Sequence, residues 1–256
     1  MRMRSLSAAV AIGAAALFAQ GVAKAAEITV LASNAVQSVL KDLAPGFERD
    51  TGHKLVVKFE VSGNLKRQIE AGEAFDVAIL PPDLMGDVAK QGKIVAGSEA
   101  EIGRSGIGVV VRAGAPKPDI SSAEAFKRTL LGAKSITYAG EGATGRYLPR
   151  LFERLGITDE VKAKTKLQTA GGRAAQTVAA GEAEIALASV SAFADLPQGA
   201  ELLGPLPSEL QHYNVFAAAL GAGARDAQAG KALIGFLTGP AAAPVLRAKG
   251  MEPAAP

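Results

Sequence analysis

Small polar residues follow four of the apolar segments of this 256-residue chain, and each group stands directly before a segment with helical spacing. At the carboxyl end of a strand, the N-terminus of the next helix presents unpaired N–H groups and a partial positive charge. Hydroxyl and amide side chains at such positions add further donors, so the set can bind an anion without a charged partner. The four groups are Ser33-Asn34, Ser62-Gly63-Asn64, Ala143-Thr144-Gly145 and Gly171-Gly172-Arg173.

Each of these groups also fits an ordinary helix cap, because serine, threonine and asparagine are the preferred N-cap residues. Their number and order, with two groups in each half of the chain, favour a shared site over four separate caps. Several charge-assisted hydrogen bonds of about 1.5–3 kcal/mol each reach micromolar affinity, which corresponds to about −8 kcal/mol. A site built of donors alone selects a ligand that only accepts, such as a fully deprotonated oxyanion.

The loop at residues 140–145 reads Gly-Glu-Gly-Ala-Thr-Gly, which is the glycine pattern of dinucleotide-binding proteins, and it lies between a predicted strand and a predicted helix. A nucleotide-dependent enzyme is therefore an alternative function. Dinucleotide-binding folds place an acidic residue about 20 positions further on at the end of a strand, whereas Asp159 and Glu160 lie in a predicted polar turn. The same loop geometry serves other anions equally well.

Few other residues of the chain have side chains suited to chemistry. The two histidines, His53 and His212, lie in polar surroundings without metal-ligand spacing, and we predict both at the surface. The absence of cysteine excludes thiol nucleophiles, thiolate metal sites and iron–sulfur clusters. Arg67 is expected on a solvated helix face, whereas Arg173, at a candidate helix start, either holds the ligand or bridges parts of the structure. We therefore predict no catalytic residue, no metal site and no cofactor.

Short apolar strands alternate with amphipathic helices along the chain, a pattern typical of α/β sheets covered by helices. We expect strands at residues 27–33, 55–59, 75–80, 107–112, 135–139, 166–169, 184–190 and 213–220. The pattern restarts near Ile107, which indicates two α/β units. We place lobe I at residues 26–108 and 216–256 and lobe II at residues 109–215, with the strands near Ile107 and Val215 crossing between them as a hinge.

The first 25 residues contain the three parts of a secretory signal: a basic start, an apolar run at residues 6–18, and Ala23-Lys24-Ala25 as a cleavage site. We expect cleavage near Ala25 and a periplasmic product. The full chain has 28 basic and 25 acidic residues. Cleavage removes Arg2, Arg4 and Lys24 and no acidic residue, so the mature chain is expected to have no net charge. A neutral chain has no basic surface for nucleic acid or for an anionic membrane. Without a cysteine for lipid attachment, we expect a monomer with no membrane anchor.

Five segments resemble the periplasmic molybdate-binding proteins of ABC transporters, and they are spread over nearly the whole chain after the leader. They are residues 29–35 (Thr-Val-Leu-Ala-Ser-Asn-Ala), 61–65 (Val-Ser-Gly-Asn-Leu), 67–72 (Arg-Gln-Ile-Glu-Ala-Gly), 75–77 (Phe-Asp-Val) and 236–242. The Arg-Gln-Ile-Glu-Ala-Gly segment is the most specific of them. The resemblance implies the type 2 periplasmic-binding fold, an α/β fold of two lobes with mixed sheets, flanking helices and a hinge.

The same resemblance implies a tetrahedral oxyanion that is held by neutral donors from both lobes. Carried over to this chain, Ser33 and the Ser62-Gly63-Asn64 turn contact the ligand from lobe I. Thr144 and the Gly171-Gly172 turn contact it from lobe II. The last contact of the family is a tyrosine near the end of the strand at residues 184–190, where this chain has Ser189, which leaves a wider cleft.

Two further positions, Asn34 and Gly63, also differ from the residues that are usual in that family. The ligand is therefore expected to be molybdate or tungstate, with another small anion or an organic acid as the alternative. The implied partners are an ABC permease and its ATPase. A binding module that serves a sensor instead of a permease is a further alternative.

Overall fold

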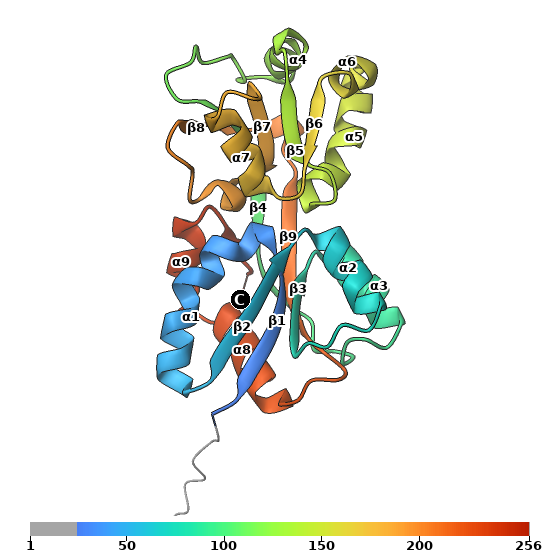
Figure 1. Ribbon diagram of the computed structural model, residues 1–256, viewed down its shortest axis with the longest axis vertical. Helices are drawn as coiled ribbons and strands as arrows, with labels where there is room; N and C mark the ends of the chain where they lie inside the picture. The colour runs from blue at the N-terminus through green and yellow to red at the C-terminus, as the bar shows by residue number, and fades with distance from the viewer. Residues whose placement is uncertain (1–24, 256) are drawn as a thin grey trace, which may run out of the picture.

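The computed structural model describes residues 25–255, so the predicted signal peptide lies, apart from Ala25, outside the described residues. Two lobes are stacked along the long axis of the molecule, as Figure 1 shows, and strand β4 (Ala100–Arg112) runs through both. Lobe I contains β1 (Glu27–Ser33), η1 (Asn34–Val36), α1 (Gln37–Thr51), β2 (Lys54–Glu60), α2 (Ser62–Glu70), β3 (Val77–Leu80), α3 (Pro82–Lys90), β9 (Tyr213–Leu220), α8 (Ala227–Thr238), α9 (Ala243–Ala248) and β10 (Glu252–Pro253).

Lobe II is built from the middle of the chain and returns to lobe I through β9. Its elements are α4 (Ala123–Gly132), β5 (Ile136–Ala139), α5 (Ala143–Leu155), α6 (Thr158–Lys162), β6 (Thr165–Gln168), α7 (Gly171–Ala179), β7 (Ile185–Ser189), η2 (Val190–Phe193), β8 (Ala200–Pro205) and η3 (Ser208–Leu210). Parallel pairs (β1 with β2 and β3, β5 with β6 and β7) join antiparallel pairs made by β4 and β9. The predicted α/β fold with mixed sheets is confirmed.

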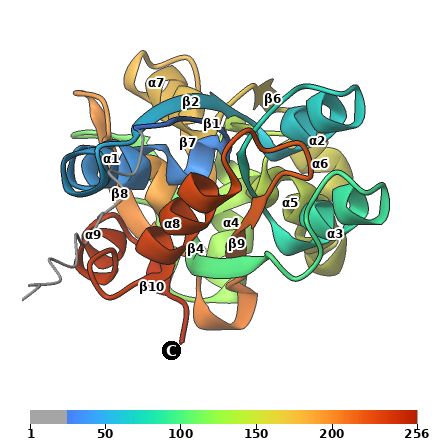
Figure 2. The same ribbon diagram turned by 90° about the horizontal axis from the view of Figure 1, so that it is seen from below.

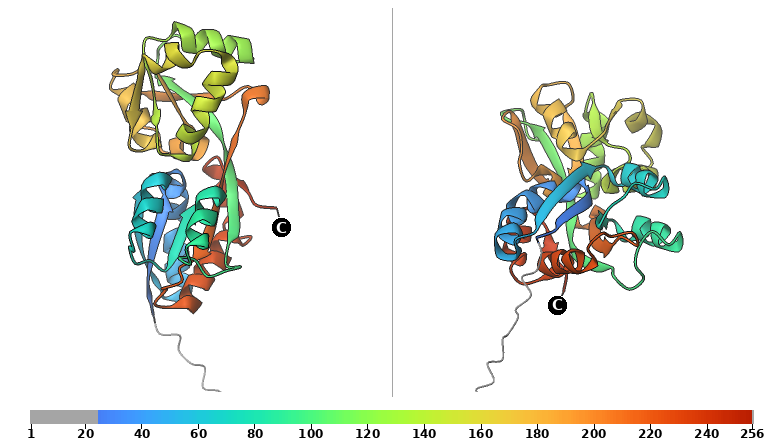
Figure 3. Two further views of the ribbon diagram at one scale, coloured as in Figure 1. Left: turned by 90° about the vertical axis from the view of Figure 1, so that its right-hand side faces the viewer. Right: turned by 60° about the horizontal axis from the view of Figure 1, so that its bottom comes forward.

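Strand β4 is shared by the two sheets. Its first half pairs with β9 as far as Gly106, and its second half pairs with β7 from Ile107 onward and with β8 from Gly108. Figure 3 shows β4 and β9 running side by side between the lobes. The prediction of a strand that begins at Ile107 was too short, because a bulge between Glu101 and Gly103 interrupts the alternation of apolar residues in the first half.

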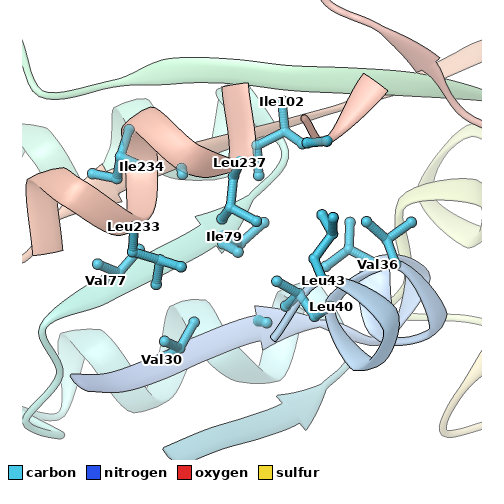
Figure 4. Close-up of a cluster of buried hydrophobic side chains, with 14 of the residues drawn as sticks. Val30, Val36, Leu40, Leu43, Val77, Ile79, Ile102, Leu233, Ile234 and Leu237 are labelled. Carbon is cyan, nitrogen blue, oxygen red and sulfur yellow. The ribbon is translucent and has the colours of Figure 1, made fainter. Parts of the chain in front are cut away.

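The core of lobe I lies on both faces of its sheet, because successive side chains of a strand point to opposite faces. Val30 packs in the cluster with α1 and α8, part of which Figure 4 shows, whereas its neighbour Leu31 packs in the cluster with α2 and α3. Figure 2 shows α1, α8 and α9 on one side of the sheet and α2 with α3 on the other. Burial of a leucine or isoleucine side chain contributes about 1.5–3 kcal/mol. These two clusters therefore hold the carboxyl ends of β1 and β2 in place.

Lobe II repeats this arrangement with its own two clusters. Val109 packs with α4, α5 and α6 on one face, and Val110 packs against α7 on the other. The two cores divide the chain at β4, where Ile102 belongs to the lobe I cluster and Ile107 to a lobe II cluster. Within residues 25–255, no helix has the length and apolarity needed to cross a membrane.

His53 is buried, which corrects the prediction that both histidines lie at the surface. Only 8% of His53 is exposed, its Nδ1 accepts a hydrogen bond from the N–H of Ala26 at 3.1 Å, and its ring stacks on Phe47. The polar neighbours of His53 in the sequence concealed this, because the covering ring comes from α1. His212 is partly buried and stacks on Tyr147, with 4.2 Å between the ring centroids.

Candidate ligand-binding site

The ends of five strands meet where the two lobes face each other, and they border a small, partly open cavity. Its free volume, measured to the centres of water-sized molecules, is about 30 Å³, which leaves room for two or so water-sized groups. The residues that line it are Ser33, Asn34, Ala35, Val61, Ala139, Gly142, Ala143, Thr144, Gly171, Leu187, Ala188, Ser189 and Ala192. Each of the four predicted groups contributes to this wall or lies directly beside it.

Ser33 supplies the hydroxyl of lobe I. It ends β1 and is 3% exposed, and its Oγ accepts hydrogen bonds from the N–H of Ala35 at 3.4 Å and from the hydroxyl of Ser62 at 3.0 Å. Ser62 begins α2, is completely buried and does not line the cavity. The described structure therefore places Ser62 behind Ser33, where it holds the hydroxyl that faces the cavity.

Gly63 and Asn64 lie at the contact between the lobes, outside the cavity wall. The N–H of Gly63 donates to the carbonyl oxygen of Glu141 in lobe II at 3.1 Å. A Cβ atom on Gly63 would lie 2.5 Å from Oε2 and 3.2 Å from the carbonyl oxygen of Glu141, so any larger residue would require Glu141 to shift. The amide oxygen of Asn64 accepts a hydrogen bond from Arg67, whose guanidinium also pairs with Glu141 at 3.1 Å.

Thr144 and Ser189 supply the hydroxyls of lobe II. Thr144 lies in the first turn of α5 and Ser189 ends β7, and their oxygen atoms are 3.5 Å apart. Helix α5 begins so close to β5 that a Cβ atom on Gly145 would overlap the carbonyl oxygen of Ala139. The glycine pattern of this loop therefore serves close packing of helix on strand, which brings the N-terminus of α5 to the cavity.

Asn214 joins these two hydroxyls, and sequence reasoning missed it. Its side-chain Nδ2 donates to Thr144 Oγ1 and to Ser189 Oγ, both at 2.8 Å, and the residue is 4% exposed. It stands near the start of β9, in an otherwise apolar strand. A lone amide in an apolar strand was the available signal, because a buried polar side chain needs a hydrogen-bond partner.

Gly171 lines the cavity at the start of α7, whereas Gly172 and Arg173 lie in a neighbouring surface hollow. Arg173 is exposed; its carbonyl oxygen accepts a hydrogen bond from the hydroxyl of Thr177 at 2.9 Å, and no hydrogen bond or ion pair joins its guanidinium to another described residue. The structure therefore brings together Ser33, Asn34, Thr144, Gly171 and Ser189 around one cavity and leaves Ser62, Gly63, Asn64 and Gly172 beside it.

None of the residues that line the cavity has an ionisable side chain. Charged side chains meet instead at the rim, where Arg146 of α5 pairs with Asp83 of α3 at 2.7 Å. Lys249 bridges Asp42 of lobe I at 3.1 Å and Asp195 of lobe II at 3.2 Å, and hydrogen bonds to these two carboxylates raise the pKa of Lys249. These pairs hold the lobes in contact, although exposed pairs contribute only about 0–1 kcal/mol each.

The cavity has no feature of a metal centre. Within residues 25–255, no three His, Asp or Glu side chains gather closely enough to hold a metal ion. Hydroxyl groups, one amide and the N-termini of α5 and α7 are the polar groups that surround it. This set suits a ligand with several hydrogen-bond acceptors and negative charge, because helix N-termini favour anions.

Comparison with known proteins agrees with this geometry. The model of the bacterial extracellular solute-binding protein family matches residues 28–252. An aconitate isomerase from Pseudomonas sp. is 30% identical over 88% of this chain and 87% of its own length, and the molybdate-binding protein ModA of Azotobacter vinelandii is 29% identical over 94% and 95%. The solved structure of the periplasmic molybdate-binding protein of Azotobacter vinelandii superposes with a TM-score of 0.73, at 19% identity, over 90% of this chain and 99% of that one.

The fold and the site between its lobes define the class of type 2 periplasmic binding proteins. Within that class, the chain belongs to the bacterial extracellular solute-binding protein family. The resemblance to molybdate-binding proteins that the sequence suggested is confirmed at the level of the family.

Proposed function

We propose that this protein binds a small, fully deprotonated oxyanion between its lobes in the periplasm and delivers it to an ABC permease and its ATPase. Molybdate and tungstate are the first candidates. The observation that carries the proposal is the small, partly open cavity between the lobes, which hydroxyl-bearing residues from both lobes line and in which no ionisable side chain takes part. Since hydroxyl and N–H donors make up most of the polar groups around the cavity, the preferred ligand is one that accepts at every oxygen.

The magnitudes are sufficient for this role. Three hydroxyl groups, at Ser33, Thr144 and Ser189, would each form a charge-assisted hydrogen bond of about 1.5–3 kcal/mol. A partly buried helix N-terminus contributes up to about 2 kcal/mol, and α5 and α7 both begin at the cavity. After the entropic cost of association, these terms are compatible with micromolar binding, which is about −8 kcal/mol.

The size of the cavity also favours a compact ligand. Its free volume of about 30 Å³ leaves room only for a ligand of a few atoms and excludes a dinucleotide while the lobes are in contact. The relatives that are named as molybdate-binding proteins align over more than nine-tenths of this chain. We place the lobes at residues 26–108 with 216–256 and at residues 109–215, and we place the hinge where β4 and β9 pass between them. Ligand contacts to both lobes would then drive closure.

A second candidate ligand is a small organic acid, because one relative is an aconitate isomerase. A tricarboxylate needs more space and more positive charge than the cavity offers. An adjoining hollow has a free volume of about 530 Å³ and shares Ala143 with the cavity; Arg150 lines it, together with Arg146, which pairs with Asp83 in the same wall. Arginine suits carboxylates because its guanidinium donates in a fixed fork.

A binding panel on the purified mature protein tests both candidates. Isothermal titration calorimetry and thermal melting would be measured with molybdate, tungstate, sulfate, hydrogen phosphate, citrate and the two aconitate isomers. A ligand at about 100 times its Kd adds about 2.7 kcal/mol of stability, which raises the Tm by several degrees. We expect molybdate or tungstate to give the largest shift. A shift with aconitate and none with any oxyanion would overturn the proposal, and NMR of the aconitate mixture would then show whether the protein interconverts the isomers.

A further inference from the structure

Asn214 is the one buried side chain among the described residues that contacts both Thr144 and Ser189, the two residues of lobe II whose hydroxyl groups border the cavity. Apart from Asn214, the nearest hydrogen-bond partner of each hydroxyl among the described residues is the other hydroxyl, at 3.5 Å. A side-chain amide nitrogen carries two hydrogens, and both are used here, one for Thr144 and one for Ser189. Each hydroxyl oxygen is thus an acceptor toward Asn214. Its own hydrogen remains free to point elsewhere.

The direction open to those two hydrogens is the cavity, because Thr144 and Ser189 both line it. Lobe I uses the same device with different residues. Ser33 accepts from the N–H of Ala35 and from the hydroxyl of Ser62, which leaves its own hydrogen for the cavity as well. All three hydroxyls around the cavity therefore accept from the protein on one side and can donate on the other.

We infer that Asn214 is a specificity-determining residue of the binding site: by donating to Thr144 and Ser189 it occupies a lone pair of each hydroxyl, directs the hydroxyl hydrogens toward the cavity and makes lobe II a mainly donating surface. Such a surface accepts an oxyanion without hydrogens and disfavours one that carries a hydrogen, because an O–H group of the ligand would face donors and lose a hydrogen bond. Asn214 acts through the two hydroxyls and is a positioning residue. The inference rests on the proposed function and adds the residue that sets its selectivity.

Asn214→Asp reverses this arrangement with little change of shape. A carboxylate only accepts, so both hydroxyls would donate to it and present lone pairs to the cavity. We expect molybdate affinity to fall about 10- to 100-fold, since one or more charge-assisted hydrogen bonds are lost. Asn214→Ala leaves the hydroxyls free to rotate toward the ligand, so we expect a smaller loss of about 3- to 10-fold.

The decisive measurement compares sulfate with hydrogen phosphate in weakly alkaline buffer, where both carry two negative charges and differ by one hydrogen. Competition against molybdate gives both Kd values. We expect the wild type to prefer sulfate, and Asn214→Asp to lower that preference at least about fivefold, because the reversed hydroxyls accept the hydrogen of phosphate. Repulsion by the new carboxylate or a partly damaged fold would weaken both anions alike and leave the ratio unchanged. Thermal melting without ligand shows whether each variant is folded.

The outcomes separate this inference from the function on which it rests. Wild-type protein that binds none of the three anions overturns the proposed function and the role of Asn214 together. Wild-type protein that binds them, with an unchanged ratio in Asn214→Asp, overturns the role of Asn214 alone. The same variant in a Thr144→Val/Ser189→Ala background should show no change of ratio relative to that background, since no hydroxyl remains for Asn214 to orient.

Discussion

The two halves of the binding cavity reach the same arrangement by different routes. In lobe I, Ser33 is held by the backbone of its own helix start and by Ser62 at the next strand end. In lobe II, Thr144 and Ser189 depend on Asn214, which is 70 and 25 residues away along the chain, respectively. The first half is therefore assembled within lobe I, whereas the second needs a strand that comes back from lobe II to the sheet of lobe I.

The two lobes are therefore expected to differ in how strongly a single substitution weakens binding. Among the described residues, lobe I presents one hydroxyl to the cavity and lobe II presents two. Asn214 orients both hydroxyls of lobe II. The loss of one hydroxyl therefore leaves the other to donate, whereas a change at Asn214 affects both.

Removal of the lobe I hydroxyl is expected to have the largest effect. Ser33→Ala should weaken oxyanion binding by about 2–3 kcal/mol, because no second hydroxyl of lobe I lines the cavity in the described structure. Thr144→Ala or Ser189→Ala alone should cost about 1–2 kcal/mol, since the other hydroxyl remains. Isothermal titration calorimetry of the three variants with molybdate measures the order.

Ser122→Ala is a matched control for these variants. The Ser122 hydroxyl accepts from the N–H of Ala125 at the start of α4 and does not line the cavity. Its loss should lower the Tm through the missing helix cap and leave affinity unchanged. Equal losses of affinity for Ser33→Ala and Thr144→Ala would contradict the contrast between the lobes, and unchanged affinity in both would place the site elsewhere.

Closure of the lobes provides the second prediction. In Gly63→Ala, the added methyl group would lie 2.5 Å from Oε2 and 3.2 Å from the carbonyl oxygen of Glu141, so the Glu141 side chain must turn away and the contact between the lobes is loosened. We expect affinity to fall by about 1–2 kcal/mol, as for a moderately overpacked contact. Small-angle X-ray scattering with saturating ligand should show a larger radius of gyration than for the wild type.

Two further variants serve as controls for the effect of Gly63→Ala on closure. Gly172→Ala places a methyl group at the start of α7 with no atom within 4 Å, so it should bind like the wild type. Glu141→Ala combined with Gly63→Ala removes the closest contact and should recover part of the affinity. If Gly63→Ala binds as tightly as Gly172→Ala, the contact between Gly63 and Glu141 plays no part in binding.

The smallest expected effect is on stability and concerns His212, which directly precedes β9, the strand that contains Asn214. Burial lowers the pKa of His212, so at neutral pH its ring is uncharged against Tyr147. The unfolded chain, with a histidine pKa of about 6.5, binds more protons than the folded protein below that value. Stability should therefore be complete above about pH 6.5 and decrease as the pH falls toward the lower folded pKa.

His212→Phe keeps the stacking ring and removes the titration. Thermal melts between neutral and mildly acidic pH should thus show a shallower loss of Tm for this variant than for the wild type. At neutral pH its oxyanion affinity should match the wild type, because His212 does not line the cavity. Parallel pH profiles of the two proteins would show that the ring stays solvated and that its burial has no energetic consequence.

Much of the fold could be predicted from local sequence patterns. Apolar runs of four to eight residues bounded by glycine, proline or small polar residues placed most strands, and the restart near Ile107 indicated a second α/β unit. Strand β8 and the first half of β4 were missed. Both have irregular burial with glycine inside the strand, so no alternation of apolar residues marks them.

The sequence by itself determined the small polar groups at the strand ends, since helix caps and tight strand-to-helix turns are local and require serine, threonine, asparagine or glycine. Only the tertiary structure showed that the charged residues beside those turns, such as Arg67, Glu141 and Arg173, stay out of the cavity wall. Only the tertiary structure decided which hydroxyls face the cavity and which stand behind it. Ser33 and Ser62 are equivalent as sequence motifs, yet one lines the cavity and the other is wholly buried. The role of Asn214 depends on contacts across 25 and 70 residues, and the packing of the two lobes alone brings those partners together.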